Sequence, residues 1–467
     1  MKIRKLLVPF AAGLLALSMA SCDKTAKKNA NYDVPAEFDT TKQINIVFYH
    51  TMGENLENVL KTAIADFEKD YPNCKVDSQK LGGYNDVYNS IQTQIANDEQ
   101  PNLAYCYSDH VASYNRAKAV VQLDNLINDS KFGFSEAERK DFIEGYYNEG
   151  KNFGDEFMYT LPFSKSTEVI YYNKTEFEKQ GWDVNKMKTW EGMMELCREI
   201  KEDYPNCYPL GIDSEANLFI ELAEQIGSPY TSAEKGNNYL FNNAKNKEFV
   251  QKFKGWFDEG LYTTQTLLGN YTSNLFVSTD DGVGKRSFIS IGSTGGASHQ
   301  YPDKTKHFEV GVAPIPTYGN VTLKCISQGP SLCIFKKADP QEVLATWIFT
   351  KYLMDPEFQV AFAQASGYNP VRNSCFDVDV PDPTDPTETK TVKYSETLAT
   401  AKGDSKTNLI SLTANVCRTL SANYFTSPAF NGSAKARIQV GDLFVAAISG
   451  TKTIDQAFED AILECED

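Results

Sequence analysis

Short apolar strands alternate with amphipathic helices through the first part of the chain. Residues 44–49 are apolar and β-rich, and Leu56, Val59, Leu60, Ala63, Ile64 and Phe67 then recur at helical spacing. A second strand over 75–79, a helix over 84–97 and a strand over 102–107 follow. This β-α-β-α-β order predicts parallel strands joined by right-handed crossovers.

Polar and aromatic loops follow each of these three strands. They contain His50, then Tyr84 after a Gly-Gly turn, then Ser108 and Asp109. Open sheets of this kind bind ligands beyond the carboxyl ends of their strands. We therefore expect half of a binding site at this edge of the sheet.

The second half of the chain repeats the pattern. Strands are predicted over 168–172, 209–212 and 287–291, and helices over 190–202, 217–226, 248–259, 340–354, 356–365, 435–448 and 454–465. A Pro-, Asp- and Thr-rich segment, 376–391, is predicted as a surface loop or insertion. The chain has 467 residues, and single cores stop growing at about 250–300 residues, so we expect two α/β lobes.

The N-terminus has the layout of an export signal. Lys2, Arg4 and Lys5 precede an apolar stretch, 6–20, that is shorter than the roughly 20 residues of a membrane span. The stretch ends in small residues directly before Cys22, which resembles a bacterial lipobox. We predict a signal peptide over 1–21, a lipidated Cys22 and a flexible tether over 22–42; the alternative is ordinary secretion with a chance cysteine.

The amino-acid composition limits which partners the protein can bind and how its cysteines can pair. The net charge is −16, which disfavours nucleic acid, because such binding rests on basic patches. Nine cysteines remain besides Cys22, and that odd number leaves at least one thiol free. Cys197 with Cys207 and Cys325 with Cys333 are near in sequence, but spacing leaves their pairing open.

Motifs for catalysis or metal binding are missing from the sequence. Only four histidines occur, with no H-E-x-x-H pair, no G-x-S-x-G elbow and no C-x-x-C. We therefore predict no metal, no cofactor and no enzymatic activity. A pair of distant carboxylates suited to glycoside hydrolysis stays open, because sequence cannot show their separation.

Several motifs, in order, resemble one family. LPFSKSTEVIYYNK (161–174), QASGYNPV (364–371) and RIQVGDLFVAAISGTKT (437–453) are the most specific, within a likeness that runs from about residue 43 to the C-terminus. They resemble the bacterial extracellular solute-binding proteins of ABC importers. Within that group the chain is similar to the glycerol-3-phosphate-binding branch, which is related to maltodextrin binders.

The resemblance implies a two-lobed periplasmic-binding-protein fold with the ligand in the interlobe cleft. The N-terminal lobe would comprise 43–165 plus 325–366, and the C-terminal lobe 166–324 plus 367–467. Crossing segments are expected at 164–167, 324–328 and 367–369. The protein would be a monomer, lipid-anchored at the outer face of the cytoplasmic membrane, and would close by hinge motion for the importer's membrane subunits to recognise.

The resemblance also implies ligand contacts, position by position. They are Tyr84, Ser166, Ser293 or Thr294, Gly329, Tyr368 and Arg437; Ser108 and Asp109 stand where the branch has an acidic contact, and His50 is a further candidate. An arginine side chain in the cleft favours phosphate, because its planar fork donates paired hydrogen bonds. Aromatic faces with carboxylates favour a mono- or oligosaccharide instead.

Overall fold

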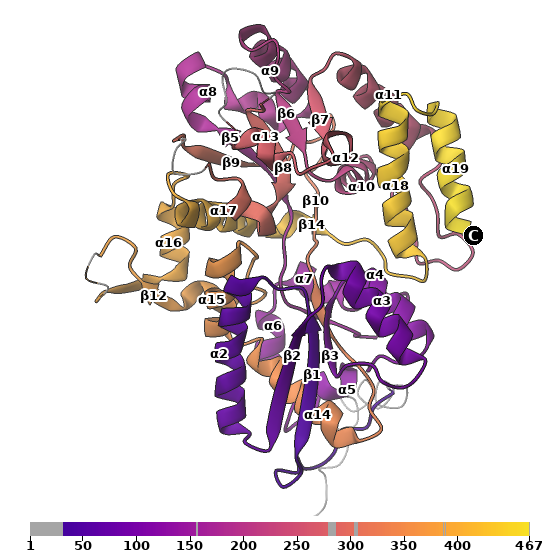
Figure 1. The fold of residues 1–467 in the computed structure, drawn as a ribbon, viewed down its shortest axis with the longest axis vertical. Helices are drawn as coiled ribbons and strands as arrows, with labels where there is room; N and C mark the ends of the chain where they lie inside the picture. Colours follow the sequence, from indigo (N-terminus) through magenta and orange to yellow (C-terminus); the bar gives the residue numbers. More distant parts are fainter. Residues whose placement is uncertain are drawn as a thin grey trace, which may run out of the picture.

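The computed structural model describes residues 31–466 except 156, 279–285, 303–306, 386 and 388. Two lobes lie one above the other in Figure 1, and each contains a five-stranded sheet flanked by helices. The two-lobed α/β fold predicted from the sequence is therefore confirmed. The predicted signal peptide and the predicted lipidation site Cys22 lie outside the described residues.

The sheet of the first lobe has the order β2-β1-β3-β11-β4. β1 (Ile44–His50) pairs in parallel with β2 (Cys74–Lys80) and with β3 (Leu103–Cys106), as the β-α-β-α-β pattern predicted. β11 (Ser331–Ile334) runs antiparallel to β3 and to β4 (Leu161–Pro162). The sheet is thus assembled from distant parts of the chain.

Helices cover both faces of this sheet. They are α2 (Glu54–Asp70), α3 (Tyr84–Ile95), α4 (Ser108–Arg116), α5 (Asp124–Ile127), α6 (Glu136–Asp141), α7 (Glu144–Glu149), α14 (Pro340–Tyr352) and α15 (Pro356–Ser366). The apolar stripe of α2 places Leu60, Ala63 and Phe67 in the core, because residues three and four apart share a helix face. Leu60 and Phe67 are almost fully buried.

The sheet of the second lobe has the order β7-β6-β8-β5-β9. Its strands are β5 (Glu168–Asn173), β6 (Leu210–Ile212), β7 (Tyr262–Thr264), β8 (Ile289–Ser293) and β9 (Val310–Pro314). β6 is parallel to β7 and β8, whereas β5 is antiparallel to β8 and β9. The antiparallel β5 follows directly from the first lobe, so the chain enters the second sheet at its cleft end.

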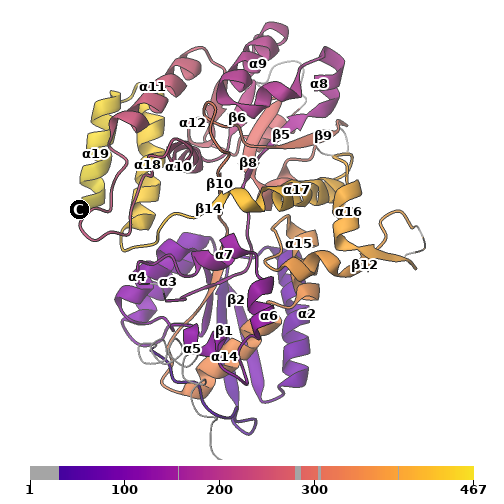
Figure 2. The same cartoon turned by 180° about the vertical axis from the view of Figure 1, so that it is seen from behind.

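The elements around this second sheet are α8 (Lys174–Gln180), η1 (Val184–Lys188), α9 (Trp190–Asp203), α10 (Glu215–Gln225), α11 (Ala244–Asp258), α12 (Gln265–Leu268), α13 (Ser273–Phe276), η2 (Thr294–His299), α17 (Lys406–Leu420), η4 (Ser421–Asn423), α18 (Ser433–Ile448) and α19 (Ile454–Glu466). Figure 2 shows α17 lying across the waist between the lobes. The four tryptophans are all buried: Trp182, Trp190, Trp256 and Trp347.

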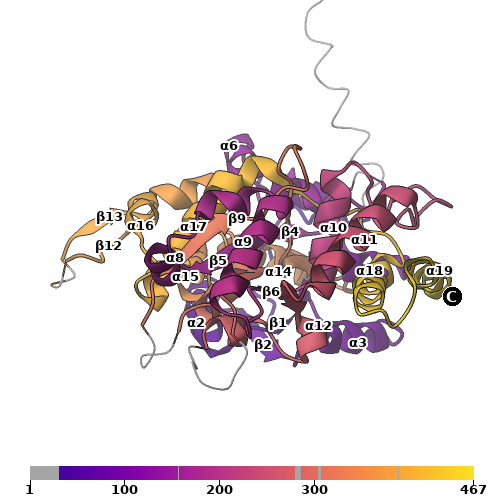
Figure 3. The same cartoon turned by 90° about the horizontal axis from the view of Figure 1, so that it is seen from above.

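The Pro-, Asp- and Thr-rich segment forms a small hairpin at the molecule's edge. β12 (Asp379–Pro381) pairs antiparallel with β13 (Thr391–Lys393), between η3 (Asn373–Asp377) and α16 (Tyr394–Thr400). Figures 1 and 3 place this hairpin at one end of the molecule and α18–α19 at the other. The surface insertion predicted from composition is present.

Three crossing segments meet at the waist. The Asn369 amide donates to the Lys165 carbonyl (2.7 Å), and Ser166 and Gln328 exchange backbone hydrogen bonds of 2.9 and 3.0 Å. Beside them, β10 (Cys325–Ile326) pairs in parallel with β14 (Tyr424–Phe425). The first crossing segment therefore contacts both of the others.

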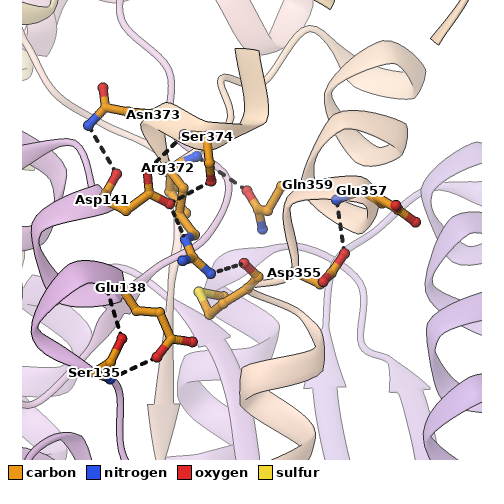
Figure 4. A network of polar contacts seen from close by, with 11 residues as sticks. Ser135, Glu138, Asp141, Asp355, Glu357, Gln359, Arg372, Asn373 and Ser374 are labelled. Atoms are coloured by element: carbon orange, nitrogen blue, oxygen red, sulfur yellow. Dashed lines mark hydrogen bonds and ion pairs between the residues drawn. The ribbon is translucent and has the colours of Figure 1, made fainter. Parts of the chain in front are cut away.

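The third crossing remains tied to the first lobe beyond residue 367, where the sequence placed the boundary of the second lobe. Figure 4 shows the tie: Arg372 Nε donates to Asp141 Oδ2 (2.7 Å), and Ser374 donates to the same carboxylate through its amide (2.8 Å) and its hydroxyl (2.5 Å). Arg372 Nη1 also donates to the Met354 carbonyl (3.3 Å). Residues 372–374 thus belong with α6 and α15.

The segment 31–42 differs from the predicted flexible tether, because it packs on the first lobe. Tyr32 is 9% exposed, and its hydroxyl donates to the Pro340 carbonyl (2.8 Å). The backbone amide of Asn31 donates to Gln122 Oε1, and the backbone amide of Gln122 donates to Asn31 Oδ1, at 2.8 Å each. The polar composition of this segment led to the wrong prediction, because a few aromatic and amide side chains are enough to hold the segment on the first lobe.

The nine described cysteines are buried and free, so neither of the two sequence-near pairs forms a disulfide. Among the described residues, no helix combines the length and apolar character of a membrane span. The same part of the chain contains no cluster of His, Cys, Asp and Glu suited to hold a metal ion.

Candidate ligand-binding site

A cavity of about 1110 Å³ opens between the two lobes. Tyr84 and Tyr107 line it from the first lobe, and Tyr368 from the third crossing. The second lobe and the waist contribute Ser166, Glu168, Asp213, Asn217, Ser293, Gln328 and Arg437. We call this space the main compartment.

The cleft continues into a second compartment of about 510 Å³. Tyr84, Tyr107, Gln328 and Arg437 line both compartments, so these four residues stand at the junction. Ser108 and Asp109, at the start of α4, line only the second compartment of the two. A ligand longer than one compartment would pass Arg437.

Tyrosines from three elements form the first-lobe wall. Tyr84 begins α3, and its ring centroid lies 4.8 Å from that of Tyr107, edge to face, and 6.0 Å from that of Tyr105, stacked. Burial raises the pKa of Tyr84 and Tyr107 above the ordinary value of tyrosine, so both hydroxyls stay protonated at neutral pH. Arg437 lines both compartments together with Tyr107, and its positive charge acts in the opposite direction on the pKa of Tyr107. The cluster offers hydroxyls and ring faces together.

The floor of the main compartment is a polar network between the second lobe and the crossings. Arg437 Nη2 on α18 donates to Asn217 Oδ1 on α10. Asn217 Nδ2 donates to Glu168 Oε1 and to Gln328 Oε1 (2.9 Å), and Gln328 Nε2 donates to Glu168 Oε1 (2.7 Å). Burial raises the pKa of Glu168 to about 7, and the hydrogen bonds from Gln328 and Asn217 lower it less.

Asp213 directly follows β6 and lies at the wall of the second lobe. Its Oδ1 accepts from the Thr272 amide (2.6 Å) and hydroxyl (2.7 Å), and its Oδ2 from Gln300 Nε2 (3.5 Å). Burial raises the pKa of this carboxyl, while the bonds from Thr272 lower it. The carboxylate can accept a further hydroxyl donor from the cleft side.

Five residues that the sequence selected line the main compartment: Tyr84, Ser166, Ser293, Tyr368 and Arg437. Ser293 is the last residue of β8, and its hydroxyl accepts from the Gly295 amide (3.3 Å), which caps the following turn of η2. Ser108 and Asp109 lie at the second compartment, where the Ser108 hydroxyl already donates to Glu149 Oε1 (2.9 Å).

Three other selected residues line neither compartment: His50, Thr294 and Gly329. The His50 ring bonds the Ser78 hydroxyl (2.8 Å) and accepts from the Met52 amide (3.2 Å), so it fixes the turn after β1. The buried Thr294 bonds the Thr167 backbone of the first crossing. Gly329 has φ +93, and a Cβ there would meet the Ser164 carbonyl at 2.0 Å, so it serves the packing of two crossings.

The lining residues that the sequence reasoning did not select include Tyr107, Glu168, Asp213, Asn217 and Gln328. Tyr107 and Asp213 stand at strand ends of the predicted sheets, so the strand-edge rule was a usable signal for both. Glu168, an acid at the start of an otherwise apolar strand, was a second signal. Asn217 and Gln328 join the site only through tertiary contacts.

Comparisons with known proteins agree with this geometry. Residues 62–391 match the family model described as bacterial extracellular solute-binding protein. The sn-glycerol-3-phosphate-binding periplasmic protein UgpB of Shigella dysenteriae is 21% identical over 341 residues, 71% of this chain and 75% of that protein. UgpB of Escherichia coli strain K12 is 21% identical over 343 residues, with the same shares.

Solved structures show the same fold. UgpB from Mycobacterium tuberculosis in complex with glycerophosphocholine superposes with a TM-score of 0.70 at 15% identity, over 90% of this chain and 97% of that one. The cyclic α-maltosyl-1,6-maltose binding protein from Arthrobacter globiformis superposes with a TM-score of 0.67 at 15% identity, over 90% and 98%.

Proposed function

The chain belongs to the bacterial extracellular solute-binding proteins, a family of non-enzymatic transport components, and from that premise we propose its role. It is the lipid-anchored, ligand-capturing component of an ABC importer and closes by hinge motion over a carbohydrate-like polyol. Our first candidate for the ligand is sn-glycerol 3-phosphate. The second is a mono- or oligosaccharide.

The observation that carries the first candidate is the position of Arg437. It lies at the junction of the two compartments, and no ion pair of Arg437 is found among the described residues. Within the described part of the chain, its side-chain hydrogen-bond partner is the neutral Asn217, and no described carboxylate pairs with the guanidinium. A planar fork of this kind donates two parallel bonds to a phosphate.

Hydroxyl groups around Arg437 support a polyol. Ser166, Ser293 and the tyrosines line the same compartment and can donate or accept at neutral pH. These groups suit glycerol as well as a sugar ring. The relatives named as sn-glycerol-3-phosphate binders support the glycerol phosphate, although their identity to this chain is low.

Two observations support the sugar as second candidate. Tyr84, Tyr107 and Tyr368 present aromatic faces beside the carboxylates of Glu168 and Asp213, a combination suited to sugar rings and their hydroxyls. The main compartment also exceeds the usual range of roughly 300–1,000 Å³ for small-molecule pockets. A secreted carbohydrate-active enzyme is the weakest reading, since Glu168 and Asp213 are both engaged by structural hydrogen bonds.

Calorimetric titration of the mature domain with sn-glycerol 3-phosphate, glycerol and maltose tests the proposal. We expect glycerol 3-phosphate to bind and Arg437→Ala to weaken it by about 100-fold, the loss of charge-assisted hydrogen bonds worth about 3 kcal/mol. Lys140→Ala is the matched control, because it removes the same charge from an exposed position on α6, outside the cavity wall. Unchanged affinity in Arg437→Ala would exclude the phosphate, and maltose binding alone would establish the sugar.

The anchor is tested separately. Cys22→Ser should release the exported protein from the membrane fraction while leaving ligand affinity unchanged, because Cys22 precedes the folded lobes. A Cys22→Ser variant that stays in the membrane fraction would contradict the lipid anchor.

A further inference from the structure

Glu168 is a buried carboxylate at the base of the cleft. It is 3% exposed, begins β5 directly after the first crossing, and borders the main compartment. Oε1 accepts from Asn217 Nδ2 and Gln328 Nε2, whereas the buried Oε2 has no hydrogen-bond partner among the residues that the structure describes. An unpaired carboxylate oxygen in such surroundings favours the protonated form.

One amide links this carboxylate to the arginine of the site. Asn217 donates its Nδ2 hydrogens to Glu168 and Gln328, and its Oδ1 accepts from Arg437 Nη2. An amide has one acceptor oxygen and one donor nitrogen, so these contacts fix its orientation. Any change in charge at Glu168 is therefore transmitted across a single side chain to the guanidinium.

The charged and titratable groups that face Glu168 come from four elements. Asp213 at the end of β6 and Glu221 on α10 are acids, Arg437 on α18 is the cation, and Tyr171 lies on β5 itself. Burial is the main cause that raises the pKa of Glu168. The charge of Asp213 raises this pKa further, and the charge of Arg437 lowers it. The resulting pKa of about 7 puts the loss of the proton close to neutral pH.

We propose that Glu168 is a positioning residue that couples ligand charge to proton uptake: it binds a proton when an anionic group docks on Arg437. The proposal rests on the proposed function, because it requires an anionic ligand. A docked anion adds negative charge close to Glu168, and it occupies Arg437, the described cation that lowers the pKa of this acid. Holding the proton on Glu168 removes that repulsion.

Thermodynamic reciprocity gives the direction of the effect. If the anion favours the proton on Glu168, the proton favours the anion equally. Affinity for the anion should then fall as pH rises above neutral, by up to about tenfold per pH unit for full coupling of one proton. A neutral polyol exerts no such charge and should show no such fall.

Titration of the mature domain with sn-glycerol 3-phosphate between pH 6 and 8.5 tests this, in wild type and in Glu168→Gln. Glutamine keeps the acceptor for Asn217 but carries no charge. We expect the variant to bind several-fold more tightly than wild type at pH 8.5 and about equally at pH 6. The phosphate's own ionisation, with a pKa near 6, affects both proteins alike and cancels in the comparison.

Two controls separate this coupling from a structural effect. Glu178→Gln removes an exposed carboxyl of the same lobe, outside the network, and should keep the wild-type profile. Titration in two buffers of different ionisation enthalpy counts the protons taken up, and wild type should take up more than Glu168→Gln near pH 7.5.

The outcomes are distinct. Parallel pH profiles in wild type and Glu168→Gln would overturn the coupling and leave the proposed function standing. Failure of glycerol 3-phosphate to bind at every pH, with or without maltose binding, would overturn the phosphate assignment and the coupling together.

Discussion

The ring of Tyr368 lies directly over Gly295, so that a Cβ on Gly295 would fall 2.8 Å from Cε1 of the ring. The contact joins the third crossing to η2 of the second lobe, at the wall of the main compartment. A second glycine completes it: Gly367 has φ +94, and a Cβ there would meet the Thr294 carbonyl at 2.6 Å. The two glycines let the crossing and η2 approach closely.

Gly295→Ala should therefore weaken ligand binding. The added methyl displaces the Tyr368 ring from the cleft wall, and we expect about a tenfold loss of affinity for whichever polyol binds, because misplaced contact groups lose their hydrogen bonds. Gly296→Ala is the matched control, since nothing lies within 4 Å of its Cβ position. Calorimetry on both variants decides: equal affinities would contradict a role of the Gly295–Tyr368 contact.

The buried Lys165 ties the first crossing to α7 through an ion pair and to Gly329 and Ser331, beyond the second crossing, through hydrogen bonds. Lys165 Nζ is fully buried and donates to Glu149 Oε2 (2.8 Å), the Gly329 carbonyl (2.9 Å) and the Ser331 hydroxyl (2.8 Å). Lys165→Met should lower the free energy of unfolding by about 3–5 kcal/mol, because Glu149 then remains buried without its cation. Denaturant unfolding measures the loss.

The exposed pair of Lys140 and Glu136 provides the comparison for this prediction. Their side chains are 75% and 74% exposed, and Lys140→Met should change stability little. The double variant Lys165→Met with Glu149→Gln should recover part of the stability, since no uncompensated charge is left. If the double variant were as unstable as the single one, packing and not charge would explain the loss.

Glu168 should also make the free protein less stable as pH rises. Its pKa is about 7 in the native state against 4.5 for the ordinary group, so the native state binds more protons between these values. Stability contributed by the protonated form is complete below pH 4.5 and is lost as pH rises through 7, by up to about 3 kcal/mol. Glu168→Gln lacks this loss.

Unfolding by denaturant at pH 5, 6, 7 and 8 tests the stability effect without any ligand. The gap between Glu168→Gln and wild type should widen up to about pH 7 and then stay constant. Glu178→Gln, a change at a side chain that is 68% exposed in the same lobe, should run parallel to wild type. A stability difference between Glu168→Gln and wild type that stays constant from pH 5 to 8 would show that Glu168 does not titrate in this range.

Local patterns predicted the elements that build the cleft. Helical spacing located α2, strand-like runs located β1, β2 and β3, and their order gave the parallel pairing that brings Tyr84 and Tyr107 together. These signals work because burial of one face repeats with the period of the helix or strand. Family motifs added Ser166, Tyr368 and Arg437, which now line the main compartment.

The floor network was beyond such signals. Asn217 and Gln328 are polar residues without a local pattern, and only the packing of α10 against the crossings places them beside Glu168. For His50 the strand-end position was predicted correctly, but the residue lines neither compartment, because its ring nitrogens bond Ser78 and Met52. Position along a strand does not decide which way a side chain's hydrogen bonds point.

The segment 31–42 shows the same limit and leads to a last prediction. Composition suggested a tether, yet Tyr32 is nearly buried, and Val34 and Phe38 pack against the core of the first lobe. Tyr32→Ala should lower the free energy of unfolding by about 3 kcal/mol, because a buried aromatic is truncated and the bond to the Pro340 carbonyl is lost. Tyr271→Ala, at a tyrosine that is 59% exposed, should cost far less. A protein beginning at residue 43 should melt earlier than one beginning at residue 31; equal melting of the two would mean that the segment contributes nothing to the lobe.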